Sequence, residues 1–182
     1  MDNALESLTH SLLRDHEVIL RAVARLENRV SEWRRSKRIE RGSLEKFIEF
    51  AKLFTDRCHH GKEERCLFPC MEKRGIPREG GPIGVMLYEH QLGRQLISRL
   101  EKAAETYFSD GSGLDEVLTV CEDYISLIRQ HIAKENDILF PMGENVVTEE
   151  DVRQTHTCYE EVELREVGEE EHHRLEKAAD EI

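Results

Sequence analysis

The chain has 182 residues, of which 35% are charged, and its formal net charge is −12. This length suits a single domain with a sizeable core and excludes two large domains. An acidic chain excludes general binding to nucleic acid, because the phosphate backbone attracts basic surfaces. No stretch reaches the roughly 18 uncharged apolar residues of a membrane-spanning helix. The first residues also lack a signal-peptide pattern, so we expect a cytoplasmic protein without a membrane partner.

Apolar residues recur at helical spacing in four long segments, and no segment shows the sustained alternation of a strand. Ser43 favours an N-cap position and Pro82 suits a first helical turn, so two of the helices should begin there. Pro69 and Pro141 are expected to end the second and fourth helices. The four predicted helices run from about Ala4 to Trp33, from Ser43 to Phe68, from Pro82 to about Phe108 and from Leu114 to Phe140.

Short to moderate links between these helices predict an all-α protein, with an antiparallel up-down four-helix bundle over residues 1–142. Residues 143–182 then form an acidic helical tail, which has 14 acidic and 4 basic residues. The sequence from Thr148 to Asp151 resembles a capping box and should begin a fifth helix, which Gly168 interrupts. We expect this tail to pack on the bundle or to bind a protein partner.

The five cysteines are odd in number and lie mostly in helical segments. In a cytoplasmic protein they are expected to be buried or free thiols, not a disulfide framework. Cys66 and Cys70 are four residues apart, which is not the C-x-x-C spacing of a zinc ribbon.

A histidine-containing repeat stands out along the chain. The stretches HHGKEERCLFP (residues 59–69) and HIAKENDILFP (residues 131–141) share six of eleven positions. In each, a histidine stands four residues before a glutamate, so both side chains project from the same face of one helix. Another histidine precedes each stretch, by 43 residues in the first copy and by 41 in the second. The repeated residues are His16, His59 and Glu63, followed by His90, His131 and Glu135.

The repeat places four imidazoles and two carboxylates at similar depths of an antiparallel bundle. Burying these groups is costly unless a cation compensates for the lost hydration. Imidazole and carboxylate are good ligands for iron or manganese, and the six repeated residues include no thiolate, which disfavours zinc and iron–sulfur sites. The spacing also differs from the Glu-x-x-His pattern of ferritin-like di-iron bundles. The repeat therefore predicts a metal centre.

The same pattern resembles the hemerythrin-like family of HHE cation-binding domains, over about residues 8–142. The resemblance implies a non-haem centre of two iron ions, bridged by carboxylate and by an oxo or hydroxo group. It implies the ligands His16, His59, Glu63, His90, His131 and Glu135. It also implies a small-molecule ligand such as oxygen, nitric oxide or hydrogen peroxide, in sensing, scavenging or iron homeostasis.

One residue departs from the oxygen carriers of that family, which have His-x-x-x-His on their third helix. Arg94 stands four residues after His90, so the second histidine is missing and reversible oxygen transport is disfavoured. If each iron is six-coordinate, the six protein ligands and one bridging oxygen leave about one open coordination position on each ion. Open positions on both ions favour activation of a bound small molecule. Two alternatives stay open: an enzyme for peroxide or nitric oxide turnover or iron-centre repair, and an iron-storing interaction module.

A second register of the metal-binding repeat also stays open. His60 and Glu64 have the same spacing as His59 and Glu63. In the register that aligns the two Leu-Phe-Pro endings, His60 is either an extra ligand, a residue that supports a ligand, or a solvent-facing side chain.

Overall fold

The computed structural model describes residues 6–182, so Ala4 and Leu5 of the first predicted helix lie outside the described residues. All regular secondary structure in the described part is helical, which confirms the all-α prediction. No helix within residues 6–182 is both long enough and apolar enough to cross a membrane. Helices labelled η are π-helices, in which hydrogen bonds close wider turns than in an α-helix. The elements are α1 (His10–Ser36), α2 (Arg41–Phe50), η1 (Ala51–His60), η2 (Glu63–Leu67), α3 (Phe68–Lys73), α4 (Pro82–Asp110), α5 (Leu114–Lys134), η3 (Glu135–Leu139), α6 (Phe140–Val146), α7 (Glu149–Glu166) and α8 (Glu169–Ala178).

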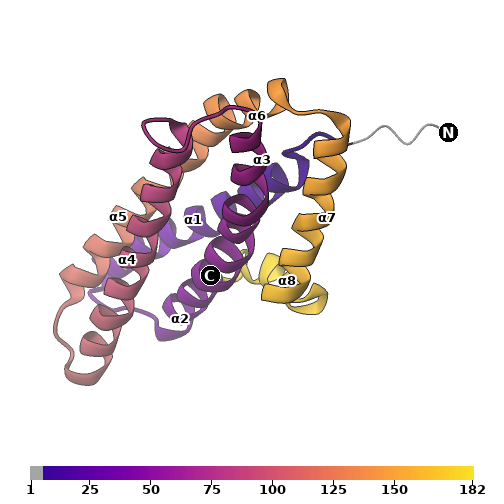
Figure 1. Ribbon diagram of the computed structural model, residues 1–182. Helices are drawn as coiled ribbons and strands as arrows, with labels where there is room; N and C mark the ends of the chain where they lie inside the picture. Colours follow the sequence, from indigo (N-terminus) through magenta and orange to yellow (C-terminus); the bar gives the residue numbers. More distant parts are fainter. Residues whose placement is uncertain (1–5) are drawn as a thin grey trace.

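These elements form four long helical rods and a helical tail (Figure 1). The first rod is α1, the second runs without a break from α2 to α3, the third is α4, and the fourth runs from α5 to α6. The first rod packs against α5 and η1, and the third rod packs against the same two elements. In the tail, α7 packs on η1 and η2, and α8 packs on η1 and α2.

The apolar core is divided into two clusters. The larger cluster contains Trp33 and Phe47, and the smaller one contains Leu12 and Phe68. Along the first and third rods the smaller cluster comes first, whereas along the second and fourth rods the larger cluster comes first. Buried histidine side chains form a polar layer between the two clusters in every rod, with buried carboxylates beside them in the first, second and fourth rods.

The start of the first helix differs from the prediction. α1 begins at His10, and Leu8 and Thr9 form a turn before it. Glu144, at the end of the fourth rod, accepts hydrogen bonds from the backbone N–H groups of Leu8 and Thr9 at 3.2 and 2.9 Å. This anchoring of the chain by a distant carboxylate has no signal in helical periodicity.

The expectation that Pro69 and Pro141 end their helices is wrong. The second rod continues to Lys73 and the fourth to Val146. Each proline follows a π-helical turn and lies in the first turn of the next α-helical segment. A proline in a first turn costs little, because its missing N–H would have had no intrahelical α-type partner there.

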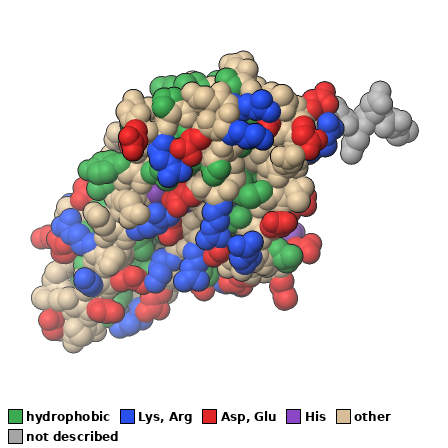
Figure 2. Space-filling model, in the orientation of Figure 1, with side chains coloured by type: hydrophobic (Ala, Val, Ile, Leu, Met, Phe, Trp, Pro, Cys, Tyr) green, Lys and Arg blue, Asp and Glu red, His purple; other side chains and the backbone are tan. Residues whose placement is uncertain are grey.

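The tail has the predicted internal signals. Thr148 caps α7, and its capping box with Asp151 is present, as the sequence predicted. Gly168 has a φ of 78° and separates α7 from α8. Tyr159 and Val162 are buried against the second rod, so this part of the tail covers that rod. Over the visible face of the molecule, acidic and basic side chains are interspersed (Figure 2).

A disulfide ties the tail to the second rod. It joins Cys66 of η2 to Cys158 of α7, across 92 residues of sequence. The expectation that all five cysteines are thiols is therefore wrong for these two. The pair was not visible in the sequence, because only the packing of α7 on η2 brings them together. Cys58, Cys70 and Cys121 are free.

We expect Cys158→Ser to lower the free energy of unfolding by about 2–4 kcal/mol, because a cross-link over a long loop restricts the unfolded chain. Denaturant unfolding of the metal-free protein measures this change. Cys70→Ser is the matched control, since Cys70 is a free, half-buried thiol one helical turn from Cys66. Equal stability of the Cys158→Ser variant and the wild type under oxidising conditions would contradict the prediction.

Candidate metal centre

The polar layer brings together all six side chains singled out by the repeat. Each of the six is at most 2% exposed, and the two glutamates are fully buried. They come from all four rods: α1, the second rod, α4, and the fourth rod at the junction of α5 with η3. The residues are His16, His59, Glu63, His90, His131 and Glu135.

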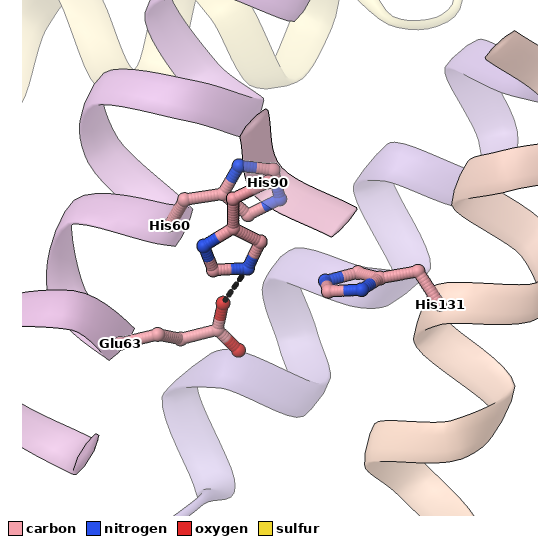
Figure 3. Close-up of side chains that lie close together, drawn as sticks. All are labelled: His60, Glu63, His90 and His131. Carbon is pink, nitrogen blue, oxygen red and sulfur yellow. Dashed lines mark ion pairs between the residues drawn. The ribbon is translucent and has the colours of Figure 1, made fainter. Parts of the chain in front are cut away.

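The potential ligand atoms form two adjacent groups. One contains His16, His59, Glu63 and Glu135, and its ligand atoms all lie within 4.8 Å of one another. The other contains Glu63 and three histidines, His60, His90 and His131, within the same distance (Figure 3). Glu63 belongs to both groups. The structure also brings in His60, which the sequence left open.

Each of the two glutamates reaches a histidine in both groups. The two oxygens of Glu63 lie 3.6 Å from His59 Nε2 and 3.3 Å from His90 Nε2 (the second pair is dashed in Figure 3). The two oxygens of Glu135 lie 3.1 Å from His16 Nε2 and 3.2 Å from His131 Nε2. Carboxylates in this position are suited to bridge two cations.

The outer nitrogens of the histidines are held by a second set of residues that the sequence reasoning missed. His59 Nδ1 lies 3.1 Å from Asp15 Oδ2, and His131 Nδ1 lies 2.9 Å from Glu89 Oε2. Each of these acids directly precedes a histidine of the repeat, and each also pairs with a lysine. Lys62 Nζ lies 2.7 Å from Asp15 Oδ2, and Lys134 pairs with Glu89.

The Nδ1 atoms of the remaining two histidines, His16 and His90, also have oxygen partners. His16 Nδ1 donates to Asn136 Oδ1 at 2.7 Å, and His90 Nδ1 lies 2.7 Å from Glu64 Oε1. Asn136 and Glu64 are the residues directly after the two buried glutamates. Such partners fix the ring so that Nε2 faces the two buried glutamates, and partners of this kind are usual for metal-binding histidines. The aligned repeat contains this signal, since Glu64 and Asn136 occupy equivalent positions.

The electrostatics of the layer show that it needs positive charge. Burial disfavours a charged imidazole, yet the Glu135 carboxylate raises the pKa of His131 to about 10. Burial likewise opposes ionisation of Glu135, yet the charges of His131 and His16 keep the pKa of Glu135 well below its usual value.

Unsatisfied atoms test whether metal ions fit. Among residues 6–182, the buried side-chain atoms without a hydrogen-bond partner include all four oxygens of Glu63 and Glu135, together with Nε2 of His90 and of His131. Buried polar atoms in folded proteins are normally paired, so such a concentration requires an explanation. Imidazole and carboxylate donors are the set that iron or manganese accepts. The residues present fit a pair of such ions.

Glu63 and Glu64 differ in position. Glu63 is fully buried and lies in both groups of ligand atoms. Glu64 lies outside them, where it accepts from His90 Nδ1 and from Arg94, and its side chain is 28% exposed. This geometry favours the register that pairs His59 with Glu63.

We expect Glu89→Ala to weaken iron binding by about 10- to 100-fold, because loss of an outer partner of a metal-binding histidine typically has that effect. Competition with a coloured chelator measures the affinity. Glu105→Ala is the control, since Glu105 is an exposed residue of the same helix. Unchanged affinity would show that His131 needs no partner to be oriented.

Comparison with known proteins identifies the family. The profile described as the hemerythrin HHE cation binding domain matches residues 7–143. The chain therefore belongs to the hemerythrin HHE family. No solved structure matches the chain significantly.

Curated relatives are distant. An uncharacterized protein of Mycobacterium tuberculosis is 24% identical over 159 residues, which are 87% of this chain and 62% of that protein. The iron-sulfur cluster repair protein YtfE of Dickeya chrysanthemi is 33% identical over 93 residues, 46% of this chain and 39% of that protein. The iron-sulfur cluster repair protein DnrN of Neisseria gonorrhoeae is 33% identical over 86 residues, 45% of this chain and 54% of that protein. The chain thus spans less than two thirds of the length of each of these relatives.

Proposed function

We propose that the protein holds two non-haem iron ions and binds or reacts with a small molecule such as oxygen, nitric oxide or hydrogen peroxide. The observation that carries this proposal is that Glu63 and Glu135 each reach a histidine in two adjacent groups, with all four carboxylate oxygens buried and without a hydrogen-bond partner. The proposed ligands are His16, His59, Glu63, His90, His131 and Glu135. The proposed setting is an antiparallel up-down bundle over residues 1–142, supported by the alternating order of the two apolar clusters.

The side chains of this centre have separate tasks. When bound, iron supplies a redox-active Lewis acid for small molecules. Glu63 and Glu135 supply negative charge and would each offer an oxygen to either of the two ligand groups, while the histidines would offer their Nε2 atoms. Asp15, Glu89 and the residues that follow the two glutamates orient the rings through Nδ1. The two apolar clusters exclude bulk water from either side.

A cavity of about 230 Å³ supports a small molecule as the ligand. It lies between the second and third rods, and its lining includes His60, Arg94 and Tyr124. The charged residues of its lining are paired with one another: Lys52 lies 2.7 Å from Glu101, and Arg94 lies 2.8 Å from Asp56. A cavity of this size without an unpaired charge suits a small neutral molecule.

Anaerobic titration of the metal-free protein with ferrous iron tests the proposal. We expect two iron ions per chain, followed by an optical change on separate exposure to oxygen, peroxide or nitric oxide. The optical change shows which of these molecules react with the centre. One tightly bound zinc ion per chain, with no uptake of iron, would overturn the proposal.

Repair of iron centres is a second candidate function, favoured by the two relatives named as iron-sulfur cluster repair proteins. In this role the bound iron would be cargo that is delivered to a damaged cluster. Incubation of the iron-loaded protein with an iron-depleted cluster protein, in the presence of sulfide and thiol, tests it. Restoration of the cluster spectrum beyond that given by an equal amount of free ferrous iron would support repair over ligand binding. A third candidate, iron storage by an interaction module, predicts uptake of more than two ions per chain.

We also propose that the tail, residues 143–182, contributes a surface for a protein partner in the cytoplasm. One face of α7 covers the second rod, through Tyr159 and Val162, and leaves the opposite face free. Leu164 on that helix is 71% exposed, and most of the net negative charge of the chain lies in this segment. An acidic surface of this kind suits a basic partner.

A further inference from the structure

The centre has an internal pseudo-symmetry that extends beyond the ligands. Residues of the first and third rods correspond with an offset of 74, as in His16 and His90. Residues of the second and fourth rods correspond with an offset of 72, as in Glu63 and Glu135. The outer partners obey the same offsets, since Asp15 corresponds to Glu89, Lys62 to Lys134 and Glu64 to Asn136.

The pseudo-symmetry fails at three positions on one side of the centre. On that side stand Asp56, His60 and Arg94, and all three are polar. The equivalent positions on the other side are apolar: Ile128, Ile132 and Leu20, which belong to the larger apolar cluster or pack against it. The break is therefore a replacement of packed apolar side chains by a connected polar set.

The three polar residues are joined to one another and to the centre. Arg94 donates to Asp56 Oδ1 at 2.8 Å and to Glu64 Oε1 at 2.7 Å, and Glu64 in turn holds His90. Asp56 Oδ1 lies 3.4 Å from His60 Nδ1. Asp56 is thus the acid nearest to His60 Nδ1, although that nitrogen forms no hydrogen bond. The ring also lines the 230 Å³ cavity.

His60 is placed as a ligand would be. It is 3% exposed, and one of its ring nitrogens lies within 4.8 Å of the ligand atoms of Glu63, His90 and His131. Its ring stacks on that of His90, with ring centroids 3.8 Å apart (Figure 3).

We propose that His60 is a seventh protein ligand, and that the two metal positions are therefore unequal. This inference rests on the proposed two-iron centre. The position beside the cavity has three imidazoles, from His60, His90 and His131, and the other has only His16 and His59. The position away from the cavity therefore has one imidazole fewer. The oxygen carriers of the family have a second histidine on their third helix, where this chain has Arg94. His60, on the second rod, supplies the imidazole that is missing there.

The variant His60→Ile tests the proposal, because isoleucine occupies the equivalent position on the other side of the centre. Mössbauer spectra of protein loaded with isotopically enriched iron distinguish unequal from equal iron sites without any measurement of activity. We expect two distinct iron environments of equal area in the wild type. In His60→Ile we expect either one merged environment or an affinity for the second iron at least about tenfold lower. His173→Ile, at an exposed histidine of α8, should keep the wild-type spectrum.

The outcomes separate this inference from the function on which it rests. Two bound irons in the wild type, with an unchanged spectrum and iron affinity in His60→Ile, would overturn the seventh ligand and leave the two-iron centre intact. A wild-type protein that does not take up two irons would overturn both. Circular dichroism of metal-free His60→Ile confirms folding, and His60→Gln provides a second variant of similar polarity, for which the same loss is expected.

Discussion

Alanine at Glu63 should empty the metal centre. The carboxylate of Glu63 belongs to both groups of ligand atoms and reaches His59 and His90 at 3.6 and 3.3 Å, so its loss removes a ligand from both ions at once. No neighbouring side chain can replace it, because Glu64 faces outward to His90 Nδ1 and Arg94. We expect the iron affinity to fall by more than the 10- to 100-fold typical of an outer partner. Iron content after gel filtration measures this loss, and Glu135→Ala should behave alike.

Glu64→Ala is the matched control for Glu63→Ala, since it removes the adjacent carboxylate from the same helix. We expect a smaller loss, of the size typical for an outer partner, because His90 keeps its place but loses the acceptor for its Nδ1. A full iron centre in Glu63→Ala together with an empty one in Glu64→Ala would reverse the assignment. The register that pairs His60 with Glu64 would then be correct.

Alanine at Asp15 should cost about 3–5 kcal/mol of folding free energy, because it leaves the partner of a buried ion pair uncompensated. The partner is Lys62, which is 1% exposed and would keep only Glu163, at 3.4 Å. Burial alone would raise the pKa of Asp15, but Lys62 and His59 lower it to about 2 from 3.8. Its stabilising contribution is therefore complete above about pH 4 and is lost as the pH falls towards 2. Denaturant unfolding of the metal-free proteins should show the variant and the wild type converging over that range.

The pseudo-symmetric residue Glu89 provides the control for Asp15. Its lysine partner, Lys134, is 37% exposed, so water can solvate the ammonium group when the acid is removed. We expect Glu89→Ala to lose well under half of the stability that Asp15→Ala loses, although both variants should weaken iron binding. Equal destabilisation by the two variants would show that burial of Lys62 is not the source of the effect.

The repeat in the sequence was sufficient to predict that His16, His59, Glu63, His90, His131 and Glu135 would come together, because a repeated spacing on helices constrains depth. The predicted third helix, from Pro82 to about Phe108, agrees closely with α4, because a proline stands at its start and a glycine follows its end. The contacts that the sequence did not predict join residues of different helical segments. The disulfide of Cys66 with Cys158 and the anchoring of Thr9 by Glu144 arise only after distant segments pack.

His60 escaped assignment for a different physical reason. An α-helix turns adjacent side chains about 100° apart, so two neighbouring histidines are not expected to face one site. The structure places His59 and His60 at the end of η1, where the wider π-helical turns alter the direction of successive side chains. Both rings are buried, and their centroids are 5.6 Å apart. Periodicity analysis assumes a regular α-helix and so has no means to anticipate this.

The π-helical turns also constrain how this chain can change during evolution. A π-helical turn accommodates an extra residue relative to an α-helix, and η2 and η3 each begin at a proposed glutamate ligand, Glu63 and Glu135. A deletion of one residue within η1 would let the helix relax to the α form and rotate every side chain beyond it. Substitutions in this segment should therefore be tolerated more often than single-residue insertions or deletions. Alignments of distant relatives should place their gaps in the links between rods and keep the segment from Ala51 to Leu67 intact.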